Sequence, residues 1–327
     1  MSATQSTDWT ITTATGRPDD DLLDRITSLA SAAEDTDGNP PLSEQTLVDL
    51  RTGEAAGRLL VVTAWLADDE GGHSGELVGV AVAVASPDEG PGTLEIVVHP
   101  EYRNDGIAAA LVAALGTQKP LGSLQAWSHG NHEAAARLAQ HHGFSPVREL
   151  WRMRLVHDAG LPPAGMPAGY RLRTFVPGQD EQAWLAANAA AFADHAEQGA
   201  MTAGDLRARM EEDWFDPEGF LIAEAQDGSI AGFHWTKVHP AMKSPTTGKH
   251  QAVGEVYVVG VVPAAQGTGL GRALTVAGIE HLRSRGLTAV MLYVDADNTA
   301  AVGLYSKLGF TRWDVDVMYA QGGAAAG

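Results

Sequence analysis

The sequence predicts two α/β domains of the same fold, arranged in tandem and related by internal duplication. The chain has 327 residues, which is long enough for two separate hydrophobic cores. Two sequence blocks recur in the same order: residues 94–111 match residues 257–274, and residues 129–144 match residues 295–310. A segment rich in Pro, Gly and Ala, 157–169, separates the copies and has the composition of a linker. The expected domains are therefore 1–156 and 170–320, followed by a disordered tail, 321–327.

Apolar periodicity and Gly, Pro and Asn punctuation predict a similar order of elements in each copy. In the first copy the expected helices are 19–33, 43–52, 106–115 and 131–142, and the expected strands are 58–66, 76–85, 93–98, 121–127 and 148–156. In the second copy the expected helices are 180–192, 202–212, 270–285 and 300–308, and the expected strands are 170–175, 220–225, 230–238, 255–261, 289–294 and 311–319. Residues 240–254 are interpreted as an insertion, with a lid as one hypothesis.

Charge and composition exclude several classes of function. The formal net charge is -19, which repels phosphate backbones and anionic membranes, so we expect neither nucleic-acid nor membrane binding. There are no cysteines, which excludes disulfides, thiolate metal sites and cysteine nucleophiles. No stretch approaches the roughly 20 apolar residues of a membrane span, and residues 1–20 do not resemble a secretory signal. We expect a cytoplasmic monomer.

A glycine-rich turn in the second copy is the clearest functional motif. Val261–Gly271 reads VVPAAQGTGLG, in which a β-branched strand ends at Pro263 and a helix begins within the glycine run. Glycines allow successive backbone N–H groups to converge, and the helix dipole adds partial positive charge. The turn therefore suits a pyrophosphate, and backbone donors can bind it without a basic surface.

Other glycine loops fit this turn less well. Its G-x-G-x-G spacing differs from the G-x-G-x-x-G of dinucleotide folds, although Asp295 does end the next strand. A P-loop is excluded because no G-K-S or G-K-T follows. A simple tight turn remains an alternative for one loop, but a second turn, Arg103–Ala108, occupies the equivalent place in the first copy.

Two motifs carry a resemblance to a known superfamily. One is a strand followed by Pro, then Gln or Arg, Gly, and Gly or Ala; the other is Asn-x-x-Ala-x-x-x-Tyr-x-x-x-Gly-Phe, residues 298–310. Together they resemble the GNAT superfamily of N-acetyltransferases, and the resemblance implies acetyl-CoA as cosubstrate and no metal. The contacts to acetyl-CoA that it implies in the second copy are Val259, Gly260, Val261, Gln266, Gly267, Thr268, Gly269, Leu270, Gly271, Arg272, Asn298, Thr299, Ala300, Ala301, Val302 and Gly303. The matching residues of the first copy are Ile96, Val97, Val98, Asn104, Asp105, Gly106, Ile107, Ala108 and Ala109.

The two copies differ where the chemistry would occur. Amide formation from acetyl-CoA needs a base for the amine and a proton for the departing thiolate. Glu255 opens the strand before the turn and is the candidate base, while Tyr305 matches the general acid of the superfamily. The aligned residues of the first copy are Gly92 and Ala139, neither of which can act in this way. We therefore expect the first domain to bind the cofactor or support the second domain without catalysing transfer.

The tandem arrangement resembles more closely the mycothiol synthase family of actinobacteria. The segments that carry this resemblance are PLSEQ, GTLEIVVHP, FADHAEQG, GFHWTKVH, GEVYVVGVVPAAQGTGLGRAL and MLYVDADNTAAVGLY. The resemblance implies acetylation of the cysteinyl amine of cysteinyl-glucosaminyl-inositol, a small pseudo-disaccharide thiol. It also implies that this acceptor contacts Glu44, Glu197, Lys237, Glu255 and Tyr293.

Some features allow other interpretations. His129, His132, His141 and His142 suggest a metal site, but the second histidine of H-E-x-x-H is missing, so a surface or packing role is preferred. Two alternative functions remain open. One is a GNAT enzyme for another amine, such as an aminoglycoside or a peptide N-terminus, and the other is a non-enzymatic acyl-CoA sensor.

Overall fold

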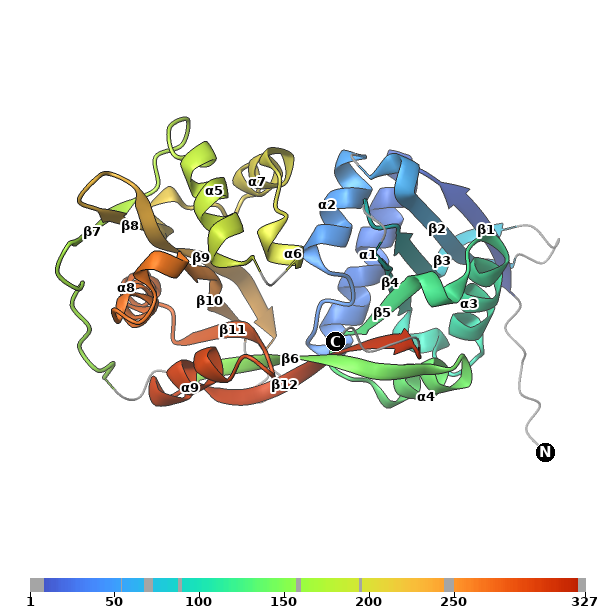
Figure 1. The fold of residues 1–327 in the computed structure, drawn as a ribbon. Coiled ribbons are helices and arrows are strands. Elements are labelled where there is room, and N and C mark those ends of the chain that lie inside the picture. Colours follow the sequence, from blue (N-terminus) through green and yellow to red (C-terminus); the bar gives the residue numbers. More distant parts are fainter. Residues whose placement is uncertain are drawn as a thin grey trace. The chain divides into compact units, whose positions relative to one another are not determined.

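The fold was analysed in a computed structural model, which describes residues 9–53, 55–67, 73–87, 90–156, 160–193, 196–243 and 250–322. The chain divides into two compact units. The first unit comprises Met1–Leu150 and Val315–Gly327, and the second comprises Trp151–Asp314 (Figure 1). No helix within the described ranges is both long and apolar enough to cross a membrane.

The first unit is a mixed sheet with helices on both faces. Its strands follow the order β1-β2-β3-β4-β5-β12-β6, in which β4 and β5 are parallel. The strands are β1 (Trp9–Thr15), β2 (Leu59–Ala67), β3 (His73–Val84), β4 (Gly92–Val98), β5 (Leu124–Ser128), β6 (Phe144–Val156) and β12 (Thr311–Gln321). The helices are α1 (Asp20–Asp37), α2 (Glu44–Thr52), α3 (Ile107–Gln118) and α4 (Glu133–His141).

Local sequence signals fix the ends of the first helices. The Asp19 carboxylate accepts a hydrogen bond from the Leu22 N–H at 2.9 Å and caps α1, and Gly38 closes the helix with φ 74°. Ser43 caps α2 in the same way by accepting from the Thr46 N–H at 3.2 Å. Both helices therefore begin within one residue of the predicted positions. Strand β1, WTITTAT, was not predicted, although its β-branched and aromatic residues favour a strand; it is half exposed at the edge of the sheet.

Alternate residues of the central strands supply two cores in the first unit. On β2, Leu59 and Val61 pack with α1 and α2, whereas Leu60 and Val62 pack with α3 on the other face. Both faces of this strand are covered, so it reads as a continuous apolar run and not as an alternating one. Helix α3 packs against this buried sheet, and the first glycine-containing turn lies at its N-terminus.

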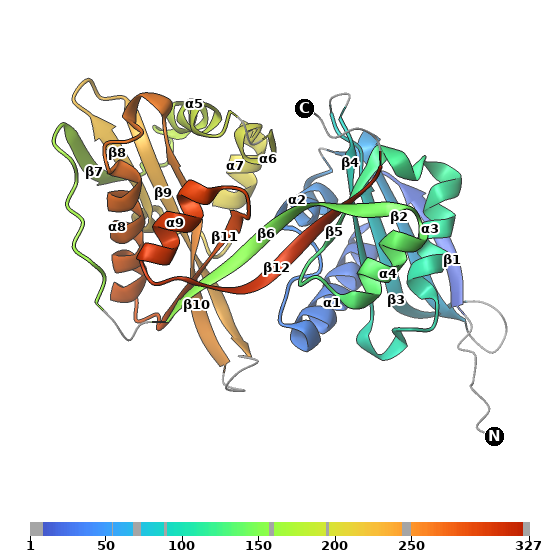
Figure 2. The same cartoon turned by 60° about the horizontal axis from the view of Figure 1, so that its bottom comes forward.

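The second unit repeats this architecture. Its strands follow the order β6-β11-β10-β9-β8-β7, with β10 and β11 parallel. The strands are β7 (Tyr170–Thr174), β8 (Phe220–Ala225), β9 (Ile230–Lys243), β10 (His250–Val261) and β11 (Ala289–Asp295), beside a part of β6. The helices are α5 (Glu181–Ala191), α6 (Ala196–Gly199), α7 (Ala203–Met210), α8 (Leu270–Ser284) and α9 (Thr299–Lys307). Figure 2 shows α8 and α9 on the same face of the sheet, where they share one apolar core.

Aromatic rings fill the opposite face of the second unit. Trp184 on α5 is fully buried, and its ring stands edge-on to those of Phe220 and Trp235. The last two rings stack with centroids 4.4 Å apart. This core holds α5 and α7 against β8–β10 and leaves β10 fixed between two packed faces.

Three parts of the chain show features that the sequence did not predict. The final strand, β12, is shared between the units: from Val315 onward it belongs to the first unit, where Val317–Ala320 pair antiparallel with β5. The segment 240–254, interpreted as an insertion, is largely a strand hairpin, because β9 extends to Lys243 and β10 begins at His250. Residues 244–249 lie outside the described residues. In the segment 157–169, Leu161 and Ala164 pack against the core beneath α8 and α9.

Candidate active site

The glycine-rich turn of the second unit has the backbone geometry of an anion site. After a single 3-10 turn at Pro263–Ala265, Gly267 and Gly269 adopt φ 76° and 87°, and Gly269 is the N-cap of α8. No side chain caps this helix end, and a Cβ placed at either glycine would have no heavy atom within 4 Å. The first N–H groups of α8 therefore have no side-chain cap, and the helix dipole at this end favours a negative charge.

Strands β10 and β11 separate just before this turn. Their ladder covers Gly254–Val256, whereas β10 continues to Val261, paired on its other side with β9. The predicted cofactor residues Val259, Gly260 and Val261 lie in this separated part. Backbone groups on the β11 side of that part are thus available to an extended ligand that adds to the strand. The residues present fit the pantetheine arm and pyrophosphate of acetyl-CoA.

Glu255 is buried among positively charged partners. Only 5% of the residue is exposed, and its Oε2 lies 2.5 Å from His239 Nε2. Burial alone would raise the pKa of this carboxyl, but the hydrogen bond from His239 and the charges of His239, Lys237 and Arg152 outweigh it and hold the pKa below its usual value. Glu255 is therefore ionised near neutral pH and can accept a proton.

Tyr305 has the opposite electrostatic setting. Its side chain lies in the apolar core formed by α8, α9 and β11, with its ring edge-on to Phe310. Burial raises the pKa of the phenol, because the phenolate would lose hydration there. The group therefore keeps its proton at neutral pH and can donate it.

Two further predicted residues of the second unit lie on β9 and β11, the strands on either side of β10. Lys237 lies directly opposite Glu255 in the register of β9 and β10, and its Nζ lies over the rings of Trp214 (4.4 Å) and Tyr257 (5.2 Å). Tyr293 on β11 has its ring beneath the guanidinium of Arg152, 5.5 Å away. The structure thus gathers Lys237 and Arg152 around Glu255 and places Tyr293 beside Arg152.

The remaining predicted residues occupy the turn and the start of the next helix. Asn298 caps α9 by accepting from the Ala301 N–H at 3.1 Å, so Thr299–Gly303 form the first turns of that helix. In the turn, Thr268 Oγ1 donates to the Ala265 carbonyl at 2.7 Å, and Arg272 is exposed. Glu44 is the first residue of α2 in the first unit, and the side chain of Glu197 lies outside the described residues.

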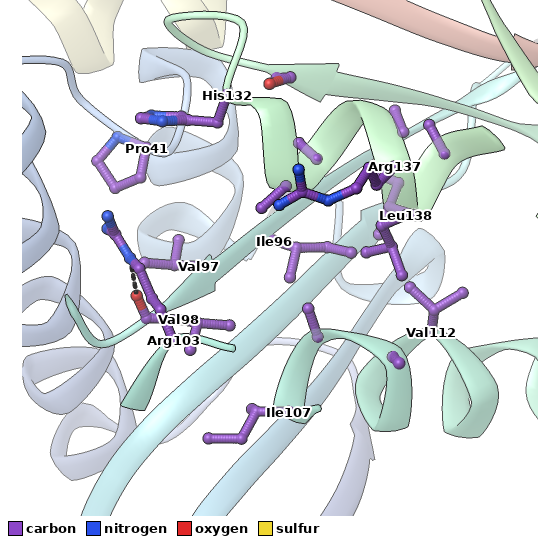
Figure 3. A pocket seen from close by; sticks show the side chains of 18 of the residues that line it. Pro41, Ile96, Val97, Val98, Arg103, Ile107, Val112, His132, Arg137 and Leu138 are labelled. Carbon is purple, nitrogen blue, oxygen red and sulfur yellow. Dashed lines mark hydrogen bonds between the residues drawn. The ribbon is translucent and has the colours of Figure 1, made fainter. Parts of the chain in front are cut away.

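The first unit contains a cavity of about 580 Å³ at the corresponding place (Figure 3). It is lined by the end of β4, which continues to Val98 beyond its Gly92–Leu94 ladder with β5, by the N-terminus of α3 and by α4. All but one of the predicted cofactor residues of this copy line the cavity, and the exception is Asp105. The lining residues are Ile96, Val97, Val98, Asn104, Gly106, Ile107, Ala108 and Ala109. Asn104 and Gly106 adopt φ 70° and 88°, and they align with Gly267 and Gly269 of the second turn. Both turns therefore adopt a left-handed backbone at the same two positions.

Comparison with known proteins identifies the family. Residues 187–310 match the model of the acetyltransferase (GNAT) family, and residues 62–146 match that of an acetyltransferase (GNAT) domain. The chain is 58% identical to the mycothiol acetyltransferase of Paenarthrobacter aurescens (strain TC1) over 98% of both chains. It is 52% identical to that of Renibacterium salmoninarum over 97% of this chain and 92% of the relative. The chain belongs to the mycothiol acetyltransferase family.

A solved structure agrees with the fold of this mycothiol acetyltransferase family member. A tandem GNAT protein from the clavulanic acid biosynthesis pathway aligns with a TM-score of 0.67 at 21% identity, covering 97% of this chain and all of the other. At this identity the likeness concerns the fold alone. The prediction of two GNAT domains related by duplication is confirmed.

One alignment between the two copies of this family member was wrong. Gly92 pairs with Leu124 across the parallel ladder of the first unit, and Gly254 pairs with Val290 in the second. Leu124 and Val290 stand at the same distance before the matched blocks 129–144 and 295–310, so these two residues correspond to each other. Their ladder partners therefore correspond as well, and the match of Gly92 is Gly254, not Glu255. A bulge between Val256 and Val258 of β10 adds one residue and causes the shift. The counterpart of Glu255 is therefore Thr93, which also lacks a carboxylate.

Two polar clusters in this mycothiol acetyltransferase family member escaped the sequence analysis. His239 contacts Glu255, the candidate base. It belongs to the motif GFHWTKVH, but the motif does not show this contact, which becomes visible only in the register of the hairpin. In the first unit, His129 lies between the carboxylates of Glu95 (2.9 Å) and Asp316 (3.1 Å). His129 is thus part of a buried ionic cluster, which the predicted surface or packing role did not include. Within the described ranges, no group of three or more His, Asp or Glu side chains could hold a metal ion.

Proposed function

We propose that this chain transfers the acetyl group of acetyl-CoA to the cysteinyl amine of cysteinyl-glucosaminyl-inositol, giving mycothiol and CoA. The observation that carries the proposal is the 58% identity to a mycothiol acetyltransferase over 98% of both chains. The geometry of the second unit supports it. An ionised carboxylate and a protonated phenol belong to elements that border the same separated pair of strands.

The two side chains have complementary roles in this reaction. Acetyl-CoA supplies an activated acetyl group as a thioester. Glu255 takes the proton that the amine loses as its nitrogen bonds to the carbonyl carbon. Tyr305 gives its phenolic proton to the sulfur as the carbon–sulfur bond breaks, and the two residues regain their starting states by proton exchange with solvent.

The acceptor contacts follow from the charges around Glu255. A sugar–inositol acceptor presents hydroxyl groups, and each needs a hydrogen-bond partner when it leaves water. Lys237 offers donors and Tyr293 a hydroxyl, both in the second unit. We propose the same role for Glu44 and Glu197, on the basis of the resemblance alone.

We also propose that the first unit binds acetyl-CoA without turning it over. Its cavity has a turn of the same backbone shape, whereas Thr93 and Ala139 stand where the second unit has Glu255 and Tyr305. Neither side chain can supply the base or the acid.

A product assay tests the proposed reaction. The full chain is incubated with acetyl-CoA and cysteinyl-glucosaminyl-inositol, with an aminoglycoside, or with a peptide that has a free N-terminus. Mass spectrometry then locates any added acetyl group. We expect N-acetylation of the cysteinyl compound and little of the other two amines. Equal transfer to all three would point to a general amine acetyltransferase, and binding of acetyl-CoA without any transfer would point to a sensor.

A further inference from the structure

His239, on strand β9, contacts Glu255 but has no role in the reaction proposed above. His239 approaches Glu255 diagonally across the β9–β10 hairpin, in which His239 faces Val253 and Glu255 faces Lys237. Diagonal neighbours on one face of a sheet lie within reach of long side chains. The imidazole Nε2 lies 2.5 Å from Glu255 Oε2, so the two groups are in direct hydrogen-bond contact, and the charge of the carboxylate strengthens the bond.

We propose that His239 is a positioning residue for acetyl transfer: it binds one carboxylate oxygen of Glu255, keeps the group ionised and directs the other oxygen to the acceptor amine. This inference rests on the proposed function, because it assigns His239 a role through the candidate base. It adds a specific partner to that base and explains how a carboxylate can stay charged in a buried site.

The surroundings of Glu255 show why such a partner is needed. Only 5% of Glu255 is exposed, so water can hydrate little of its carboxylate. A carboxyl group buried in this way ordinarily keeps its proton. The charged groups that face it are Lys237 and His239 from β9 and Arg152 from β6. Lys237 is also held over two aromatic rings, and Arg152 is 3.4 Å from Asp314.

His239 differs from these cations in making the hydrogen bond itself. Of the partners that hold the pKa of Glu255 down, the hydrogen bond from His239 acts most strongly, ahead of the charges of Lys237 and Arg152. A hydrogen bond also fixes direction, which a distant charge cannot do. His239 is about one-fifth exposed, so it links the buried carboxylate to the surface of the second unit.

A direct titration of Glu255 tests the first half of the inference without any need for activity. The full chain is labelled with ¹³C at glutamate carboxyls, and the resonance of Glu255 is assigned by its loss in Glu255→Gln. In His239→Ala we expect the pKa of Glu255 to rise by about one unit or more, since an opposite charge at this range lowers a carboxyl pKa by roughly 1–3 units. His239→Gln keeps a donor and should show a smaller rise.

A matched control uses another histidine of the same unit. His281 also pairs with a carboxylate, Asp216, at 3.4 Å, and has no part in the proposed site. His281→Gln should leave the titration of Glu255 and the rate of acetyl transfer unchanged. If His239→Ala does not fold, as judged by circular dichroism and thermal melting, His239→Gln and His239→Asn carry the test.

The kinetic half separates the possible failures. We expect His239→Ala to lower kcat at pH 7 by about 10-fold or more, with the KM for acetyl-CoA changed little, and His239→Gln to recover most of the loss. An unchanged pKa of Glu255 in folded His239→Ala would overturn the inference, and so would a shifted pKa with wild-type kcat. If the wild-type chain transfers no acetyl group while the pKa still shifts, the proposed function fails, whereas the contact between the two residues stands.

Discussion

His129 and Asp316 form an ion pair across the first unit, with His129 Nδ1 3.1 Å from Asp316 Oδ2. Asp316 lies on β12, and its other oxygen accepts from the Gly130 N–H at 2.8 Å. On the far side of the imidazole, Glu95 accepts from Nε2 and also from the N–H of Ser43, whose hydroxyl oxygen caps α2. A single buried cation thus joins β4, β12 and the N-terminus of α2.

We expect this cluster to make the first unit sensitive to alkaline pH. Burial alone would lower the pKa of His129, but the hydrogen bonds to Asp316 and Glu95 outweigh it and raise the pKa to about 10. Because the folded pKa lies above the unfolded value, the stabilisation is complete below about pH 6.5 and is lost as the pH rises through about 10. The melting temperature of the wild type should fall as the pH rises from 8 to 10.5, whereas that of His129→Gln should change less over the same range.

Removing His129 altogether should be costly at neutral pH. His129→Ala leaves two buried carboxylates without their cation, and breaking such a pair costs about 3–5 kcal/mol. Urea unfolding at pH 7 measures this loss. His132→Gln serves as the control, since His132 is more exposed and lies 3.7 Å from Asp37. Equal stabilities for the two variants would contradict the assigned role.

Replacing Tyr305 should affect the chemical step more than binding. Tyr305→Phe keeps the ring packed in its apolar core and removes only the proton donor. We expect kcat to fall by about 10²-fold or more with little change in KM, because general acids contribute roughly 10²–10⁴-fold. Steady-state kinetics with Tyr170→Phe as the matched control provide the measurement. A kcat close to that of the wild type would remove Tyr305 from the mechanism.

The two turns should respond differently to the same substitution. Gly269→Val and Gly106→Val each place a β-branched residue at a φ near +87°, at a strain of about 1–3 kcal/mol, and bring a side chain toward the phosphate site. Calorimetry of the wild type should give two acetyl-CoA sites per chain, and each variant should retain one. Acetyl transfer should be lost in Gly269→Val and largely kept in Gly106→Val. Loss of transfer in both variants, with the fold intact, would mean that the first site is needed for catalysis.

The position of Lys237 predicts an effect on the acceptor. Its ammonium lies over the rings of Trp214 and Tyr257, and Lys237 is opposite Glu255 in the strand register. Lys237→Ala should raise the KM for the acceptor by about 10-fold, the effect of losing about 1.4 kcal/mol of binding, while the KM for acetyl-CoA stays near its wild-type value. Lys237→Arg keeps the positive charge, so its KM for the acceptor should lie between those of the wild type and Lys237→Ala. An unchanged acceptor KM in Lys237→Ala would exclude this contact.

Local signals in the sequence predicted most of the fold. Asp19 and Ser43 mark helix starts, and Gly106 and Gly269 mark the turns, because capping and left-handed conformations depend on the residue itself. Apolar periodicity and Gly, Pro and Asn punctuation placed the remaining elements, and the two matched blocks showed that their order repeats. These features depend on short stretches of chain and can therefore be read without a structure.

Features that depend on pairing between distant strands could not be predicted in this way. The bulge in β10 beside Tyr257 gives no signal in the sequence, yet it moved the match of Glu255 from Gly92 to Thr93. The contact between His239 and Glu255 depends on hairpin register, which becomes visible only when β9 and β10 are paired. The ionic cluster around His129 needs Asp316, a residue from the other end of the sequence.

The division of β12 has a consequence for how the protein is made on the ribosome. The first unit needs Val317–Ala320 to pair with β5, but these residues are translated only after the whole of the second unit. Until then β5 is paired with β4 alone, and His129 lacks Asp316. The nascent first unit should therefore remain open and susceptible to proteolysis while the second unit is synthesised, and the amino-terminal half of the chain should complete its folding last.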